Sequence, residues 1–343
     1  MPEKTLRDGL VRPVRRDLRG LTGPTPAQTR GPRWRRTSRG FYVPSHVTDD
    51  LPEQRILEAS AVAPPGLGVT GWAALRWCGA RWFDGTAADG SRRPVTIAVS
   101  THDIRPQPGI AVTGEGAPPR LVTTVDGVCV TRPVWSTSFE MRYAGSERAA
   151  VVVLDMAAYA DLVSFSEMQD FLGTQSAWTG IPQARAASAL AVENSWSPQE
   201  SWMRLAWQLD AGLPPPLCNV PIFDLHGRHL VTPDLFDPEA GLVGEYDGHL
   251  HLEPGQRRRD IRRGERCHEH DLEVVVAVSG DLRPGDSFVS RLLAARRRAR
   301  RRQPARRTWT LEQPSWWVPT ETVAQRRRLT DEERRVWLAR RRA

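Results

Sequence analysis

The order of helix-like and strand-like segments predicts mixed helices and strands, with an α+β N-terminal half followed by an α/β C-terminal region. In the C-terminal region, the helical segment SPQESWMRLAWQL precedes three short apolar runs. A basic helical segment and the strand-like run LEVVVAVS follow, which gives the order α-β-β-β-α-β. In the N-terminal half, strand-like runs such as VTIAVS and GVCVTRPV alternate with segments of helical spacing such as LPEQRILEAS. At 343 residues the chain is long enough for two domains with separate cores.

Changes in composition divide the chain into four regions. Residues 1–38 are rich in Arg, Pro and Gly, so we expect a basic arm with little regular structure, which either contacts nucleic-acid phosphate or is simply solvated. Residues 39–190 and 191–302 form the two predicted domains, and residues 303–343 form a tail rich in Arg and Trp. We expect Trp316 and Trp317 to pack this tail onto the domain body, with stacking on unpaired bases as the alternative.

Charge and hydropathy narrow the class of partner and the location. The net charge of +8 and the isoelectric point near 10.1 favour a polyanionic partner, and nucleic acid first. No run of eighteen apolar residues is present, so no membrane span is expected. The N-terminus lacks the apolar core of a secretory signal, and we expect a cytoplasmic protein. The four scattered cysteines include no C-x-x-C pair, which predicts reduced, buried thiols.

The C-terminal domain begins with a helix whose start is marked in the sequence. Ser197 is the predicted N-cap, Pro198 stands at the first helical position, and Gly212 ends the helix. Glu200 lies in the first turn. It is either an additional acidic ligand of a site or an acid that is favoured there by the helix dipole.

Two strand-like runs, HLVTPDLF and GLVGEYDG, carry three acids and are joined by a turn at Asp237-Pro238. Neighbouring strands bring Asp234 beside Glu245, and Asp247 projects from the same strand face as Glu245 because it lies two residues further on. Three carboxylates on one face repel each other unless a cation lies between them. Hard oxygen ligands suit Mg²⁺ or Mn²⁺, which activates water for phosphodiester hydrolysis. The alternative is a structural cluster neutralised by neighbouring arginines.

Arginine-rich helices follow the acids. The segment 256–268 is a predicted basic helix, and a second Arg run covers residues 296–302. Arg offers paired donors to phosphate, and each neutralised phosphate adds sequence-independent affinity. A solvated basic face is the alternative. The predicted DNA-binding residues are Arg257, Arg258, Arg259, Arg262, Arg263, Arg296, Arg297 and Arg298.

Histidines near the acids allow two interpretations. His251, on the extension of the second strand, is predicted to orient water or a phosphate, with a surface histidine as the alternative. The pair His249 and His251, together with the run Cys267-His268-Glu269-His270, allows a zinc site instead. The spacing of these residues is irregular, and the pairs come from different elements.

Residues 197–282 resemble a known nuclease family. Asp234, then Glu245-x-Asp247-Gly, a His three residues after the Gly and Asp260-x-x-Arg263 resemble actinobacterial proteins related to very-short-patch-repair endonucleases, in the PD-(D/E)xK superfamily. The resemblance implies a restriction-endonuclease-like core in which Asp234 and Glu245 bind the metal and His251 assists. Asp247, which completes the site or positions the water, stands where the superfamily pattern has Lys. Resembling proteins also carry a Glu at the position of Glu200.

The N-terminal half resembles a second family. The segments RGFYVP, VTGWAALRWCGA, DGVCVTRPV and AVVVLDMAA are similar in order to AbiEi-type antitoxins and transcriptional regulators. This resemblance implies a cognate toxin protein as partner. Members of this family often begin with a winged-helix module, but the leader before Gly40 is too short and too rich in Pro to form one. Two functions therefore stay open: a metal-dependent endonuclease, and a non-catalytic antitoxin or regulator that uses the nuclease fold as a binding module.

Overall fold

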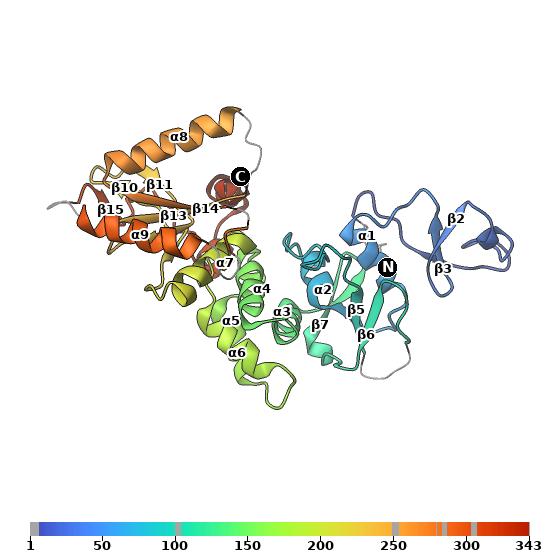
Figure 1. The fold of residues 1–343 in the computed structure, drawn as a ribbon. Helices are drawn as coiled ribbons and strands as arrows, with labels where there is room; N and C mark the ends of the chain where they lie inside the picture. The colour runs from blue at the N-terminus through green and yellow to red at the C-terminus, as the bar shows by residue number, and fades with distance from the viewer. Residues whose placement is uncertain are drawn as a thin grey trace. The chain divides into compact units, whose positions relative to one another are not determined.

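A computed structural model describes residues 7–99, 104–248, 254–278, 280–282, 287–302 and 307–342, and the chain divides into two compact units (Figure 1). Unit 1 comprises Met1–Val153 and Ser166–Ala186, and unit 2 comprises Leu154–Phe165 and Ala187–Ala343. Helices and several sheets alternate along the chain, so the fold is α/β. The predicted boundary after residue 190 lies close to the division at Ala187. Unit 2 also takes in Leu154–Phe165 and the tail, which the sequence had suggested was a separate region.

Unit 1 begins with a small antiparallel sheet in the order β1-β3-β2. The expectation of little regular structure before residue 39 is wrong for two stretches, because β1 and β2 pair with β3 on either side. Phe41 and Val43 alternate as buried residues of β3, so their side chains project from one face of this sheet, while β1 and β2 pair with the two edges of β3. The strands are β1 (Val14–Arg15), β2 (Trp34–Ser38) and β3 (Phe41–Pro44).

A five-stranded sheet in the order β6-β5-β4-β8-β7 forms the main part of unit 1. Two fully buried tryptophans of α2, Trp72 and Trp77, belong to its core. The strands are β4 (Gly68–Thr70), β5 (Val95–Ala98), β6 (Ile110–Thr113), β7 (Val122–Val125) and β8 (Val128–Thr131). The helices of this part of the chain are α1 (Pro52–Ser60), α2 (Gly71–Trp77), α3 (Pro133–Arg142), α4 (Glu147–Tyr159), α5 (Phe165–Gly173) and α6 (Ile181–Leu190).

The main sheet of unit 2 has the order β14-β13-β12-β9. Its strands are β9 (Leu217–Cys218), β12 (Leu235–Asp237), β13 (Leu242–Asp247) and β14 (Glu273–Val278). The pairs β9–β12 and β12–β13 are antiparallel, whereas β13 and β14 are parallel and are connected through α8 (Pro254–Glu269). A helical crossover is the usual connection between parallel neighbours.

The run HLVTPDLF was predicted to be one strand, and the structure divides it into two. β11 (His229–Val231) pairs with β10 (Ile222–Asp224) in a second sheet, whereas β12 begins at Leu235 in the main sheet. Pro233 lies between them and has no backbone N–H to donate to a ladder, which explains the break. The second sheet has the order β11-β10-β15, and the tail supplies β15 (Trp309–Thr310).

Helices cover the two faces of the main sheet (Figure 1). On one face, α7 (Pro198–Leu205), the π-helical turn η3 (Ala206–Asp210) and α9 (Phe288–Arg301) share a core with Leu242 and Val275. On the other face, Cys267 of α8 packs with Val243. On the first face, Gly244 lets Trp207 of η3 approach the sheet closely, because a Cβ at Gly244 would lie 3.2 Å from Cζ3 of Trp207. Side chains alternate along a strand, so Glu245 and Asp247 share the face of Val243 and α8.

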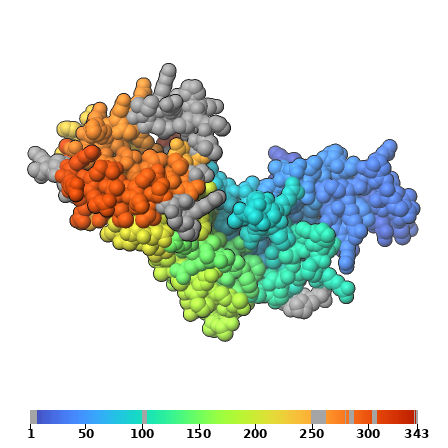
Figure 2. Space-filling view, in the orientation of Figure 1, coloured from blue at the N-terminus to red at the C-terminus, as the bar shows by residue number. Residues whose placement is uncertain are grey.

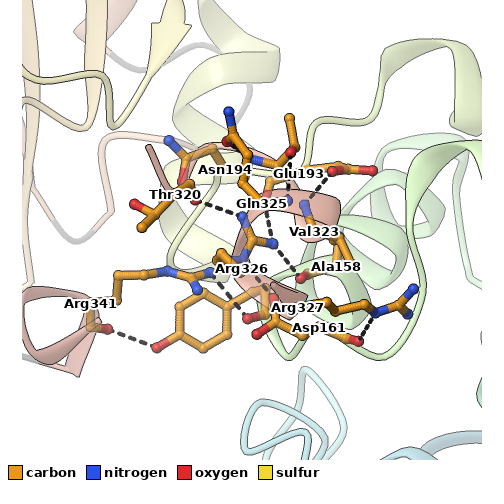
Figure 3. A network of polar contacts seen from close by, with 12 residues as sticks. Ala158, Asp161, Glu193, Asn194, Thr320, Val323, Gln325, Arg326, Arg327 and Arg341 are labelled. Atoms are coloured by element: carbon orange, nitrogen blue, oxygen red, sulfur yellow. Dashed lines mark hydrogen bonds and ion pairs between the residues drawn. The ribbon is translucent and has the colours of Figure 1, made fainter. Parts of the chain in front are cut away.

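The tail is anchored to unit 2 by a buried arginine in α10 (Val323–Arg327), shown in Figure 3. Arg326 is fully buried and donates to an Asp161 carboxylate oxygen at 2.6 Å and to the carbonyl of Ala158 at 2.8 Å. Trp317 packs as predicted, with its ring centroid 5.1 Å from that of Phe223. The Trp316 ring also contacts Phe223, at 6.1 Å between centroids, although Trp316 is 54% exposed. The last helix is α11 (Asp331–Trp337), which Thr330 caps as predicted.

None of the described helices is long and apolar enough to cross a membrane. The four cysteines are free thiols; Cys218 and Cys267 are buried as predicted, whereas Cys78 and Cys129 are partly exposed.

Candidate active site

Asp234 and Glu245 lie at the same end of the main sheet. Asp234 lies one residue before β12, and Glu245 follows Gly244, the β13 partner of Leu235. The backbone N–H of Tyr246 donates to Oδ2 of Asp234 at 2.7 Å and holds the carboxylate at the β13 side. Asp234 thus lies outside the strand on which the sequence analysis placed it.

Glu200 is the third acid of this region and comes from the first turn of α7. Ser197 caps the helix, because its Oγ accepts a 3.2 Å hydrogen bond from the Glu200 N–H. The Glu200 side chain is 8% exposed, and its Oε2 accepts hydrogen bonds from the Trp196 N–H at 2.8 Å and from Nδ2 of Asn219 at 2.7 Å. A Ser-x-x-Glu sequence at a helix start is typical of a capping box, but this glutamate binds outside its own helix.

The electrostatics of Glu200 and Asp234 are linked. Burial, and then the nearby charge of Asp234, raise the pKa of Glu200 to about 8. Burial also raises the pKa of Asp234, against the opposing effects of the Tyr246 N–H and of Arg263. Two buried carboxylates whose pKa values rise in this way do not both ionise readily without a counter-charge. The pair therefore favours the uptake of a proton or a cation.

Glu245 has a counter-ion from the protein. Arg263, on α8, lies with a guanidinium nitrogen 2.7 Å from Oε1 of Glu245, and it also donates to the carbonyl of Thr232 at 2.7 Å. The Glu245 side chain is 17% exposed, so the ion pair is largely shielded from water. Neutralisation by arginine, which the sequence left open for the whole cluster, is thus present for Glu245. No such ion pair is found for Glu200 or Asp234 among the described residues.

The remaining predicted ligands are Asp247, two histidines and the run Cys267-His268-Glu269-His270. Asp247 ends β13 and is partly exposed. His249 and His251 lie outside the described residues, so the structure does not address their predicted roles. Cys267 is buried, which raises the pKa of its thiol to about 11, and His268 is exposed. Across the described ranges, no group of three or more Asp, Glu, His or Cys side chains is arranged to hold a metal ion.

The predicted basic helices are present, but their arginines differ in surroundings. On α8, Arg262 is exposed and Arg263 turns toward Glu245. On α9, Nε of Arg296 lies 2.8 Å from Oδ2 of Asp237, and Arg298 pairs with Glu273. Arg297 is exposed. Figure 2 shows the side chains of α9, in orange-red, at the surface of unit 2. Much of the charge on α9 is therefore engaged within the fold. Arg257, Arg258 and Arg259 belong to α8, but their side chains lie outside the described part.

Asn219 is a site residue that the sequence analysis missed. It follows β9, is 2% exposed and has a φ of 49°, in the left-handed region that Asn tolerates better than most residues. The sequence predicted a single strand over CNVPIFDL, with Asn219 inside it, whereas the structure divides this run between β9 and β10 and leaves Asn219 in the connection. Its contact with Glu200 depends on the packing of α7 against β9.

Comparisons with known proteins identify no relative: no family model, curated protein or solved structure matches the chain significantly. The interpretation of the site therefore depends on its own chemistry. The site contains the buried carboxyls of Glu200 and Asp234, whose pKa values are raised, and Glu245, which is paired with Arg263 of the basic helix α8.

Proposed function

We propose that unit 2 is a metal-dependent endonuclease that hydrolyses DNA phosphodiester bonds. The observation that carries the proposal is the buried pair of Glu200 and Asp234, in which the charge of Asp234 contributes to the raised pKa of Glu200. The resemblance of residues 197–282 to very-short-patch-repair-like nucleases supports the same assignment. Unit 1, whose sequence resembles AbiEi-type proteins, is proposed to bring the protein to its target or partner.

The donor set suits a hard divalent cation. Glu200 and Asp234 offer carboxylate oxygens, the ligand type that Mg²⁺ and Mn²⁺ prefer, and a cation between them would remove their mutual repulsion. Glu245 would join them once Arg263 releases it, and Asp247 lies two residues further along the same strand face. When bound, such an ion activates water and stabilises the charge of an in-line phosphoryl transition state.

Residues of α8 would engage the substrate. Arg262 is exposed on this helix, and Arg263 lies at the acid site with its guanidinium on Glu245. A phosphate that approaches Arg263 would compete with Glu245 for the guanidinium, so DNA binding and release of Glu245 would be linked. His251 is proposed to orient the attacking water or the phosphate. The net charge of +8 favours association with DNA.

A second function is favoured by the ion pair between Arg263 and Glu245. If this pair persists with DNA bound, Glu245 is unavailable to a cation, and Asp247 stands where the resembling superfamily has Lys. Unit 2 would then bind DNA without cleaving it, and the protein would act as an antitoxin or transcriptional regulator, with a toxin protein as partner.

A cleavage assay with matched variants distinguishes the two functions. The full chain is incubated with linear, supercoiled, mismatched and single-stranded DNA in Mg²⁺ and in Mn²⁺. Asp234→Asn should abolish cleavage and leave DNA binding intact, whereas Glu312→Gln, at an exposed acid of the tail, should cleave like the wild type. Cleavage by the wild type that equals the residual activity of Asp234→Asn would indicate a contaminant. Salt-sensitive DNA binding without cleavage of any substrate would favour the regulator.

A further inference from the structure

Asn219 connects the two chain segments that carry the buried acids. Its Nδ2 donates to Oε2 of Glu200 at 2.7 Å, and its backbone N–H donates to the carbonyl of Asp234 at 3.1 Å. Glu200 lies at the start of α7 and Asp234 lies just before β12, so these elements meet at one residue. The position of one carboxyl relative to the other therefore depends on Asn219.

The loop around Asn219 is fixed from a second direction. Asn194 donates from Nδ2 to the carbonyls of Cys218, at 2.8 Å, and Asn219, at 3.1 Å. In return, Nδ2 of Asn219 donates to the Asn194 carbonyl at 2.8 Å. Both hydrogens of the Asn219 amide are thus used, one on Glu200 and one on Asn194, and this defines the orientation of the amide.

The carbonyl oxygen of the Asn219 amide, Oδ1, is buried and has no hydrogen-bond partner among the described residues. It shares a carbon with Nδ2, so it lies within about 5 Å of the Glu200 oxygen that Nδ2 contacts. A buried acceptor without a partner costs about 1–3 kcal/mol, so such an atom seldom persists without a purpose. Oδ1 is also a hard oxygen, which can bind Mg²⁺ directly or accept a hydrogen bond from a water molecule on the ion.

We propose that Asn219 is a positioning residue of the acid site, which holds the Glu200 carboxylate beside Asp234 so that both acids bind one divalent ion. This inference rests on the proposed function of the site. A carboxylate that is held in place by a hydrogen bond loses less side-chain freedom when it binds an ion, so the site is preorganised. Without the Asn219 donor, Glu200 Oε2 keeps only the hydrogen bond from the Trp196 N–H, so its carboxyl is held less firmly beside Asp234.

The test uses one substitution with a matched control, and Mn²⁺ alone as the probe. Asn219→Gly accepts the positive φ and removes the amide without adding a charge to the site. Asp271→Gly is the control, because Asp271 is an exposed residue of the same unit with a φ of 56°. Calorimetric titration gives the Mn²⁺ affinity of each folded protein. Cleavage assays then give the rate at saturating Mn²⁺.

Asn219→Gly should bind Mn²⁺ at least tenfold more weakly than the wild type, whereas the rate at saturating Mn²⁺ stays within about threefold. This split distinguishes positioning from general damage to the fold. Asp271→Gly should match the wild type. Wild-type Mn²⁺ affinity in a folded Asn219→Gly protein would overturn the inference and leave the proposed function in place.

An NMR measurement without metal tests the positioning role of Asn219 separately from the proposed metal site. The ¹³C signal of the Glu200 carboxyl, identified by its loss in Glu200→Gln, should shift in Asn219→Gly and stay in place in Asp271→Gly. An unchanged signal in Asn219→Gly would overturn the positioning role. A wild-type protein that fails to bind Mn²⁺ would instead overturn the metal site of the proposed function.

Discussion

A guanidinium nitrogen of Arg263 lies 2.7 Å from Oε1 of Glu245 and thus joins the basic helix α8 to the acids of the sheet. The pair links the two halves of the proposed chemistry, since the same arginine is expected to contact phosphate and the same glutamate is expected to bind a cation. Glu245 has a partner within the protein, whereas Glu200 and Asp234 are buried near each other, and burial together with the charge of Asp234 raises the pKa of Glu200 to about 8. The acids of the site therefore differ in electrostatic state, although the sequence presents them as equivalent.

Glu245 and Asp247 should differ in importance for cleavage. Glu245→Gln keeps the shape of the side chain and removes its charge, so we expect cleavage to be abolished. DNA affinity should be retained or increase, because the substitution frees Arg263 for phosphate. Asp247→Asn should reduce the rate less, because Asp247 ends β13 at a partly exposed position. Rates and affinities measured in parallel on purified proteins check this order. Full activity of Glu245→Gln would remove Glu245 from the mechanism.

Removal of Arg263 should have two opposite effects. Arg263→Gln frees Glu245 from its counter-ion, so the protein should bind Mn²⁺ more tightly but bind DNA more weakly. Arg262→Gln, at the exposed neighbouring residue, should weaken only DNA binding. In a salt titration, each substitution should reduce the slope of log affinity against log salt by about one if its arginine contacts one phosphate. Equal Mn²⁺ affinity in Arg263→Gln and Arg262→Gln would contradict the proposed competition for Glu245.

The raised pKa of Glu200 makes the stability of unit 2 depend on pH. Between its ordinary pKa of 4.5 and about 8, the folded protein holds a proton on Glu200 that the unfolded chain releases. The Glu200 contribution to the free energy of unfolding therefore decreases as pH rises through this window. Glu200→Gln should leave the melting temperature unchanged near pH 4.5 and raise it by several degrees at pH 8–9, in the presence of EDTA.

The control for the pH experiment is Glu312→Gln, which changes an exposed acid of the tail. It should follow the wild-type melting curve across the whole pH range. Mg²⁺ should narrow the difference between the wild type and Glu200→Gln at pH 8–9, because the ion replaces the missing counter-charge. A wild type that becomes more stable than Glu200→Gln as pH rises would contradict the assigned direction of the pKa shift.

Arg326 should be essential for anchoring the tail to unit 2. It is fully buried, and it pairs with Asp161 and donates to the carbonyl oxygens of Ala158 and Glu193 (Figure 3). Arg326→Met removes these donors and leaves the carbonyls without them, so we expect a loss of about 3–5 kcal/mol in the free energy of unfolding. Arg328→Gln, an exposed position in the same segment, should change stability by less than about 0.5 kcal/mol. Urea unfolding of both variants measures the difference.

The sequence alone determined most of the local elements of the C-terminal region. Ser197 and Pro198 marked the start of α7, the Asp237-Pro238 turn joined β12 to β13, and the spacing of Glu245 and Asp247 defined their shared face. These features depend on backbone conformation over a few residues, and such preferences are written in the residue types themselves. The break at Pro233 was missed, although its signal was present, because the apolar pattern continued across it.

Tertiary structure decided which groups meet at the site. Asn219, Glu200 and Asp234 come from three separate elements, and Arg263 reaches Glu245 from a fourth. No pattern within a single segment specifies such contacts, because they depend on how helices and strands far apart in the sequence pack together. The charge state of a carboxyl depends on that packing too: burial and the field of neighbouring groups, which exist only in the folded chain, set the pKa of Glu200.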